Sequence, residues 1–488
     1  MASVTKEQFA KGAIWKMLES LATVGIGAVV SLILTRLLAP EDYGVIALVS
    51  VFIVLSEILI QSGLATALVR VKNVDDLDYS TALITSTAIS ILLYCVMFVC
   101  APLIAHFYSS DILKPVLRVQ ALSVLLCPIA SIRAAKLIRN LDFKPLFFIK
   151  AFSGVISGTL GIVMALMGFG VWALVAQRLL ELLCTNVIIV IYKKWRFVFV
   201  FSMERLKQLF SFSMWTLLVG LLTFSGNYVF TAIIGKTYSM TDLGYYNKGN
   251  HSPEMLARYS IGSIVNVFLP TASSRQDDKQ RLKSATRKTI AVSSYVLFPM
   301  MIGLAIVGEK FVALLFTEKW LPCVPILYCA CLYYAFDPLR SLNIQLTYSL
   351  GNSRSVVYIE TLRLGILASA LVLCVLVFNA GIYILSLSVA VANLLALLIS
   401  QMFVKRQIAY TFREWVSDLT PAILLSACMA GAVYGIGLLS LSLILLLALQ
   451  LILGASVYIT LSVLFRVESF RDICDVLRGI IASKRRVA

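Results

Sequence analysis

The sequence has few charged side chains for its 488 residues. Asp, Glu, Lys and Arg make up 14% of it, whereas hydrophobic residues make up 60% and the mean hydropathy is +0.92. Because a soluble globular protein has about 25% charged residues, this composition excludes one. The chain also lacks long polar or low-complexity tracts, which excludes a disordered protein. The apolar runs are continuous and do not alternate, so they predict an all-α integral membrane protein and not a β-barrel.

Metal-binding and catalytic patterns are scarce as well. The chain has two histidines, His106 and His251, and ten cysteines without a CxxC pair, so neither a zinc site nor a disulfide framework is expected. Walker A, GxSxG and HExxH motifs are missing. A membrane polymerase or ligase needs a long loop that carries catalytic carboxylates, and the sequence offers none. It therefore favours transport without a bound cofactor over catalysis.

Fourteen apolar stretches reach the roughly 20 residues that a spanning helix needs. The first is too long for a signal peptide and is expected to remain as a membrane helix. The predicted helices cover residues 13–38, 43–64, 81–107, 113–132, 146–166, 171–192, 210–234, 243–269, 289–307, 322–346, 356–378, 382–403, 421–438 and 441–464.

Basic residues are unevenly distributed between the two sets of loops. If the N-terminus is cytoplasmic, the cytoplasmic segments hold 30 Lys and Arg, against five in the segments on the other side. The positive-inside rule then predicts a cytoplasmic N-terminus and C-terminus, which agrees with an even number of helices. This bias explains the net charge of +17 without a nucleic-acid partner. The basic tail, residues 467–488, is expected to lie on the anionic cytoplasmic leaflet.

An internal repeat emerges when the sequence is compared with itself. At an offset of 200 residues the matching pairs are Trp15 and Trp215, Thr23 and Thr223, Arg36 and Lys236, Asp42 and Asp242, and Gly44 and Gly244. At an offset of 210 they are Pro128 and Pro338, Ser131 and Ser341, and Lys144 and Arg354. A repeat of six helices predicts two lobes related by a pseudo-twofold axis along the membrane normal, with a cleft between them. The expected divisions are 1–206 and 207–410 for the lobes, 411–466 for helices 13 and 14, and 467–488 for the tail.

Charged side chains inside spanning helices are costly, so they mark a site or a neutralised pair. The predicted helix 243–269 carries a polar stripe at steps of four, three and four, formed by Asn247, His251, Glu254 and Arg258. Such a stripe predicts a wet cavity between the lobes. Arg36 and Lys236 are expected at its outer mouth, and Arg133, Arg139 and Arg340 in its inner half. The predicted cavity residues are Arg36, Glu57, Gln61, Lys236, Lys248, His251, Glu254, Arg258 and Arg340.

Two further pairs favour plain neutralisation. Arg178 and Glu181, and Glu360 and Arg363, are three residues apart, a spacing at which opposite charges lower each other's insertion cost. The cationic cavity residues favour a phosphate or acidic sugar as ligand. A mixed Glu/Arg stripe also fits coupling to H⁺ or Na⁺, and the sequence leaves the two open. Gly154 and Gly158 form a GxxxG pattern that predicts close helix packing.

Four stretches resemble a known family. They are LTRLLAPEDYGVIALV (34–49), SGLATALVR (62–70), LPTASSRQDDKQRLK (269–283) and FPMMIGLAIVGEKFVALLFTEKW (298–320). Together with fourteen helices in two lobes, they resemble the Wzx-type polysaccharide flippases of the multidrug/oligosaccharidyl-lipid/polysaccharide exporter (MOP) superfamily. Within these, the last two stretches are similar to the colanic acid exporter branch.

The resemblance implies a function in the bacterial cytoplasmic (inner) membrane. Undecaprenyl-pyrophosphate-linked oligosaccharides would be moved from the inner to the outer leaflet by alternating access. Helices 13 and 14 would hold the lipid tail, and polysaccharide polymerase and chain-length proteins would be neighbours. A cation-coupled multidrug antiporter of the same superfamily is the alternative, and lipid II is a narrower choice of substrate.

Overall fold

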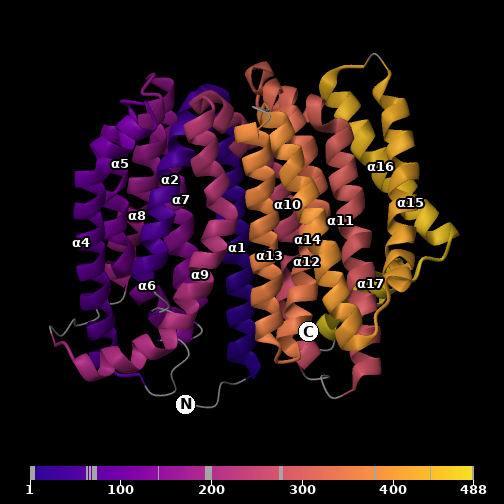
Figure 1. Cartoon of the computed structure of the whole chain (residues 1–488), viewed down its shortest axis with the longest axis horizontal. Coiled ribbons are helices and arrows are strands. Elements are labelled where there is room, and N and C mark those ends of the chain that lie inside the picture. The colour runs from indigo at the N-terminus through magenta and orange to yellow at the C-terminus, as the bar shows by residue number, and fades with distance from the viewer. Residues whose placement is uncertain are drawn as a thin grey trace. The chain divides into compact units, whose positions relative to one another are not determined.

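The computed structural model describes residues 6–61, 64, 68, 74–140, 142–192, 200–273, 278–377, 381–439 and 441–485. Within these ranges every regular element is a helix (Figure 1). The chain forms two compact units, residues 1–244 and 245–488. The sequence-predicted division at residue 206 stays a prediction. Most of the stretch 62–70, which supported the family resemblance, lies outside the described residues, as do the side chains of Trp215 and Thr223.

The first unit is arranged around helix α2, which contacts α4, α5, α6, α8 and α9, while α1 packs on α7 and α7 on α8. Its helices are α1 (Lys6–Leu37), α2 (Pro40–Gln61), α4 (Asp76–Phe107), α5 (Leu113–Gln120), α6 (Leu122–Arg139), α7 (Phe143–Leu166), α8 (Val171–Tyr192) and α9 (Met203–Thr237). The first five residues of α10 (Met240–Ser273) also belong to this unit.

The second unit is arranged around α11, which contacts α12, α14, α15, α16 and α17. Besides the rest of α10, its elements are α11 (Lys279–Leu315), the short 3₁₀ helix η1 (Glu318–Cys323), α12 (Val324–Ser349), α13 (Ser353–Val372), the π-helical turn η2 (Leu373–Val377), α14 (Ile382–Ile408), α15 (Phe412–Gly437), α16 (Leu443–Leu464) and α17 (Glu468–Arg485).

Twelve helical segments of the described residues are long and apolar enough to span a membrane, so the chain is a multi-pass membrane protein. They correspond to twelve of the fourteen predicted spans. The fourth predicted span consists of α5 and α6 together, and the tenth consists of η1 and α12 together. The two long helices outside this set are α9 and α10. The total of fourteen spans therefore remains a prediction.

Several helices begin earlier than hydropathy predicts because polar side chains satisfy their first backbone N–H groups. Asp75 and Asp78 form a capping box at the start of α4, and Thr411 and Glu414 form another at the start of α15. The Asp75 pKa lies below its usual value because its carboxylate accepts a hydrogen bond from the backbone N–H of Asp78. These caps extend the helices beyond their apolar spans into polar surroundings.

Helix α11 differs most from the prediction. It was expected over residues 289–307. The helix instead runs without interruption from Lys279 to Leu315. Asp278 caps its start through its carboxylate, which accepts hydrogen bonds from the backbone N–H groups of Gln280 and Arg281. Basic residues predicted in a loop therefore lie on the first turns of this helix.

Close packing confirms the prediction made from the GxxxG pattern. A Cβ atom added at Gly158 of α7 would lie 2.4 Å from Cγ2 of Val30 in α1, and one at Gly154 would lie 3.3 Å from Cγ2 of Ile26. Both distances are shorter than ordinary contact between carbon atoms. The two glycines thus let α1 and α7 approach each other.

Asp42 and Asp242, which match each other in the repeat, each lie in a turn between two helices of the first unit. Oδ2 of Asp42 accepts a hydrogen bond from the Ala39 N–H at 3.0 Å, and Oδ2 of Asp242 accepts one from the Ser239 N–H at 3.3 Å. Helix α1 ends at Leu37 and α9 ends at Thr237, so both helix ends keep the predicted offset of 200 residues. Each aspartate therefore fixes the start of the following helix.

Candidate functional site

A cluster of four charged residues lies inside the second unit, between α12 and α13. Arg340, whose side chain is 9% exposed, donates to Oδ1 of Asp337 from Nη2 (2.9 Å) and Nε (3.2 Å). Its Nη1 donates to Oε1 of Glu360 at 2.6 Å. Arg363 donates from Nε to Oε2 of the same glutamate at 2.7 Å. Two guanidinium groups and two carboxylates thus neutralise each other in a protein interior.

The structure explains part of this cluster differently from the sequence. The neutralising pair of Glu360 and Arg363 is confirmed. Arg340, predicted to line the inner half of a cavity, is buried in the same network. Asp337 was missed, although its place three residues before Arg340 was a usable signal. The contact between Arg340 and Glu360 had no such signal, because it joins two helices.

The polar stripe on α10 lies in the same unit. Arg258 donates from Nη2 to Oε1 of Glu254 at 2.7 Å, and its side chain is 68% exposed. His251 is exposed too and interacts electrostatically with Lys248 and Arg258.

Lys248 differs from the rest of the stripe because it is buried. Only 4% of its surface is exposed, and its Nζ lies 4.5 Å from the centre of the Phe316 ring. The contact has the geometry of a cation–π interaction. The neighbouring Gly249 approaches the main chain closely, since an added Cβ would lie 2.9 Å from the carbonyl oxygen of Cys323. Lys248 is thus packed against the segment that joins α11 to α12.

Three charged residues of the first unit form a second cluster. Arg178 of α8 bridges Glu57 of α2 at 3.3 Å and Glu181 at 3.6 Å. The predicted pair of Arg178 and Glu181 is therefore confirmed, and Glu57 joins it from another helix. Nε2 of Gln61 lies 3.8 Å from Sγ of Cys127, in the range of a weak hydrogen bond to sulfur.

The cations at the helix ends contact backbone carbonyls. Lys236, expected at the cavity mouth, donates to the carbonyl oxygen of Phe107, the last residue of α4, and lies over its ring. Arg139 donates to the carbonyl oxygen of Leu68 at 2.7 Å. Arg36 lies exposed in the last turn of α1. A positive charge at a helix C-terminus is favourable because the free carbonyls there are partially negative.

The contact of Lys236 makes a prediction about stability. Lys236→Met removes both the donor and the charge at the end of α4, so we expect the free energy of unfolding to fall by about 0.5–1 kcal/mol. Thermal unfolding in detergent measures the effect. An unfolding temperature equal to that of the unsubstituted protein would show that this contact does not stabilise the fold.

Among the described residues no group of three His, Cys, Asp or Glu side chains is placed to hold a metal ion. The buried charges of Arg340 and Arg363 are compensated by ion pairs within their own unit, whereas Arg258 and His251 are accessible. Whether the nine predicted residues line one cavity stays a prediction.

Comparison with known proteins gives the family. The profile described as "Polysaccharide biosynthesis protein" matches residues 33–325. The lipopolysaccharide biosynthesis protein WzxC of Escherichia coli is 22% identical over 376 residues, which is 74% of this chain and 75% of WzxC. The succinoglycan biosynthesis transport protein ExoT of Rhizobium meliloti is 25% identical over 316 residues, 64% of this chain and 63% of ExoT. The teichuronic acid biosynthesis protein TuaB of Bacillus subtilis is 26% identical over 329 residues, 67% and 68% of the two chains.

Solved structures agree on the fold. The lipid II flippase MurJ in an inward closed conformation superposes with a TM-score of 0.75 at 16% identity, over 94% of this chain and 100% of that one. An inward-facing MATE multidrug resistance transporter of the MOP superfamily gives 0.63 at 14% identity, over 80% and 94%. The resemblance inferred from the sequence is thus confirmed: the chain belongs to the polysaccharide biosynthesis protein family and has the fold of MOP-superfamily transporters.

Proposed function

We propose that this protein is a flippase that moves lipid-linked oligosaccharides, the repeat units of a surface polysaccharide, across the membrane. The family match, which covers more than half of the chain, carries the proposal. The relatives' names refer to the biosynthesis of succinoglycan, teichuronic acid and lipopolysaccharide, and one of them to transport. The fold, shared with a lipid II flippase, supports movement of a lipid-linked substrate. The substrate class is undecaprenyl-pyrophosphate-linked oligosaccharide.

The mechanism we propose is alternating access in the bacterial inner membrane. Fourteen spanning helices would form two six-helix lobes, related by a pseudo-twofold axis, and a C-terminal pair. The excess of basic residues in one set of loops supports a cytoplasmic N-terminus and C-terminus. The sugar-pyrophosphate would bind at mid-membrane depth while the lobes rock around it. The chain itself would form and break no covalent bond, and polymerase and chain-length proteins would act on the product.

For substrate contact we propose the accessible part of the α10 stripe. Arg258 and His251 are exposed, and a guanidinium group binds phosphate oxygens through two parallel hydrogen bonds. Glu254 holds Arg258 in place in the absence of substrate. Lys248 and Arg340 are buried against neighbouring groups. We propose that they contribute to the shape and the charge of the substrate site without contacting the substrate.

This assignment predicts a selective loss of export. Arg258→Gln keeps the side chain polar but removes the charge, so we expect surface polymer to fall by about tenfold, the effect of losing one charge-assisted hydrogen bond. The amount of folded protein should not change, because Arg258 is exposed. Arg281→Gln is the matched control, since Arg281 is 82% exposed and pairs with Asp278 three residues away at 3.1 Å. Equal polymer levels in both variants would remove Arg258 from the site.

A cation-coupled multidrug antiporter is the second candidate, favoured by the similarity to a multidrug transporter at a TM-score of 0.63. A deletion strain distinguishes the two functions. A flippase predicts loss of surface polymer with unchanged drug sensitivity, whereas an antiporter predicts increased drug sensitivity with normal polymer.

A further inference from the structure

The three C-terminal helices contact α11 along most of its length. Figure 1 shows α15 and α16 beside α11, with α17 below them, in the second unit. Several of the contacts are hydrogen bonds and ion pairs, which hold helices in one register more specifically than apolar packing does. They occur at the first turns of α11, at its middle and near its last turns.

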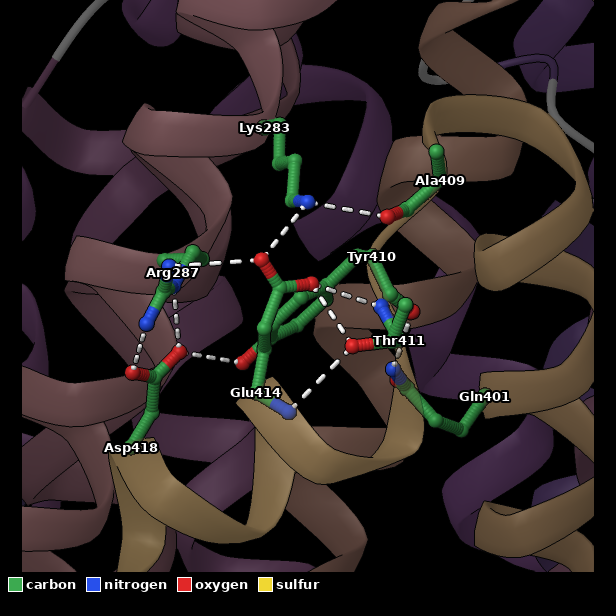
Figure 2. A network of polar contacts seen from close by, with 8 residues as sticks. All are labelled: Lys283, Arg287, Gln401, Ala409, Tyr410, Thr411, Glu414 and Asp418. Atoms are coloured by element: carbon green, nitrogen blue, oxygen red, sulfur yellow. Dashed lines mark hydrogen bonds and ion pairs between the residues drawn. The ribbon is translucent and has the colours of Figure 1, made fainter.

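The densest contacts join the first turns of α11 to the first turns of α15 (Figure 2). Arg287 makes a two-pronged ion pair with Asp418, with Nε 2.9 Å from Oδ2 and Nη2 2.7 Å from Oδ1. Lys283 donates to Oε1 of Glu414 at 2.8 Å, and Arg287 lies 3.6 Å from the same oxygen. We call these four residues, Lys283, Arg287, Glu414 and Asp418, the inner clamp.

The link between α14 and α15 is tied to the inner clamp. Tyr410 is fully buried and donates from its hydroxyl to Oδ2 of Asp418 at 2.7 Å. Burial and this hydrogen bond raise the pKa of Tyr410 far above its usual value, so the phenol remains a donor. Lys283 donates to the carbonyl oxygen of Ala409 at 2.9 Å, and Nε2 of Gln401 donates to that of Tyr410 at 3.3 Å. The backbone connection is therefore held from both sides.

The rest of α11 is attached in the same manner. At mid-length, the Tyr295 hydroxyl lies 2.6 Å from Oγ of Ser462, and the Tyr458 hydroxyl donates to the Tyr295 carbonyl oxygen at 2.7 Å. Farther along, Lys310 donates to the carbonyl oxygen of Gly437, the last residue of α15, at 2.8 Å. Lys288 pairs with Asp472 of α17 at 2.6 Å. The contacts to α15, α16 and α17 span most of α11.

We infer that α15, α16 and α17 are fixed to α11 and move with the second unit as one rigid body during transport. This inference rests on the proposed alternating-access function. If α15 and α16 swung away from α11, the doubly hydrogen-bonded ion pair of Arg287 and Asp418 would break, and both charges would have to be rehydrated or left buried without a partner. The hydrogen bond from Tyr410 to Asp418 would be strained or lost as well. Sliding of α15 along α11 would break the contacts of Glu414 and Gly437 together. The polar contacts thus favour a single position of α15, α16 and α17 on α11 over a continuous range of positions.

A reversible covalent link between α11 and α15 tests the inference. Lys283→Cys and Glu414→Cys are introduced into a chain whose ten native cysteines are replaced, and the two thiols are joined by a cleavable bifunctional reagent. The side chains of these residues meet at their tips, so a short linker bridges them. Because no relative motion is required, we expect linked and reduced protein to translocate lipid-linked oligosaccharide at rates within about twofold. Lys16→Cys with Glu19→Cys, within a single helix, controls for the reagent.

A loss of about tenfold on linking, reversed by reduction, would overturn the rigid-body inference and leave the flippase function intact. Failure of the proposed function looks different, since wild-type protein would then move no lipid-linked oligosaccharide in the same assay. If the first variant does not fold, Tyr295→Cys with Ser462→Cys places the link between α11 and α16. Spin labels on the outer faces of α11 and α15 give an independent readout: one unchanged distance is expected with and without substrate, and two distances would contradict the inference.

Discussion

Gly44→Ala is expected to destabilise the protein severely. An added Cβ at Gly44 would lie 1.8 Å from the carbonyl oxygen of Met240, and one at Gly244 would lie 1.9 Å from that of Pro40. All four residues belong to the first unit, at the starts of α2 and α10. Because the clashing atoms are backbone atoms, no side-chain rotation relieves the contact. We expect a loss of about 3 kcal/mol or more in the free energy of unfolding, at the upper end of overpacking effects.

The measurement is the unfolding temperature and yield of folded protein in detergent. Gly431→Ala is the matched control, because Gly431 also lies in a helix, α15, and has no atom within 4 Å of the added Cβ. Alanine is the better helix former there, so stability should stay equal or rise by up to about 1 kcal/mol. If the Gly44→Ala and Gly431→Ala variants unfold at the same temperature, the close contact between the starts of α2 and α10 would be contradicted.

Arg340→Ala is expected to have the largest effect of any charge substitution in the second unit. It removes the guanidinium group between Asp337 and Glu360 and leaves two carboxylates in the protein interior with less compensation. Breaking one partner out of a buried ion pair costs about 3–5 kcal/mol. Arg340→Lys should recover only part of the loss, because an ammonium group does not make the same set of hydrogen bonds.

Arg258 provides the comparison for this experiment. Its pair with Glu254 is exposed, and such pairs contribute about 0.3–0.5 kcal/mol. We therefore expect Arg340→Ala to reduce the yield of folded protein, whereas Arg258→Ala reduces export with a normal yield. If Arg340→Ala gave folded, stable protein that fails to export, Arg340 would be assigned to substrate binding and the neutralising role of the cluster would be contradicted.

The sequence was sufficient where a feature is local. Residues 171–192 were predicted as a helix, and α8 has these same bounds. The pairs of Arg178 with Glu181 and of Glu360 with Arg363 follow from a spacing of three residues. Helix starts were less predictable, because hydropathy detects only the apolar part of a helix. Thus α15 begins at Phe412 and not near residue 421, since a polar capping box stabilises its first turn.

Contacts between helices could not be predicted from the sequence. Arg287 and Asp418 are 131 residues apart, and nothing local to either residue indicates the other. Lys236 matched Arg36 in the repeat and was therefore expected at a cavity mouth, but its partner is the end of α4, which no sequence pattern connects to it. In a membrane protein charged residues are few, and the tertiary fold determines which group each of them pairs with.

The most direct test of the flippase function is the sidedness of lipid-linked oligosaccharides in a strain that lacks the protein. Inside-out and right-side-out membrane vesicles are prepared, and the sugar head groups are labelled with a reagent that does not cross the membrane. The account predicts that repeat units accumulate on the cytoplasmic face and return to the outer face when the gene is restored. An unchanged distribution in a strain without a second flippase would contradict it.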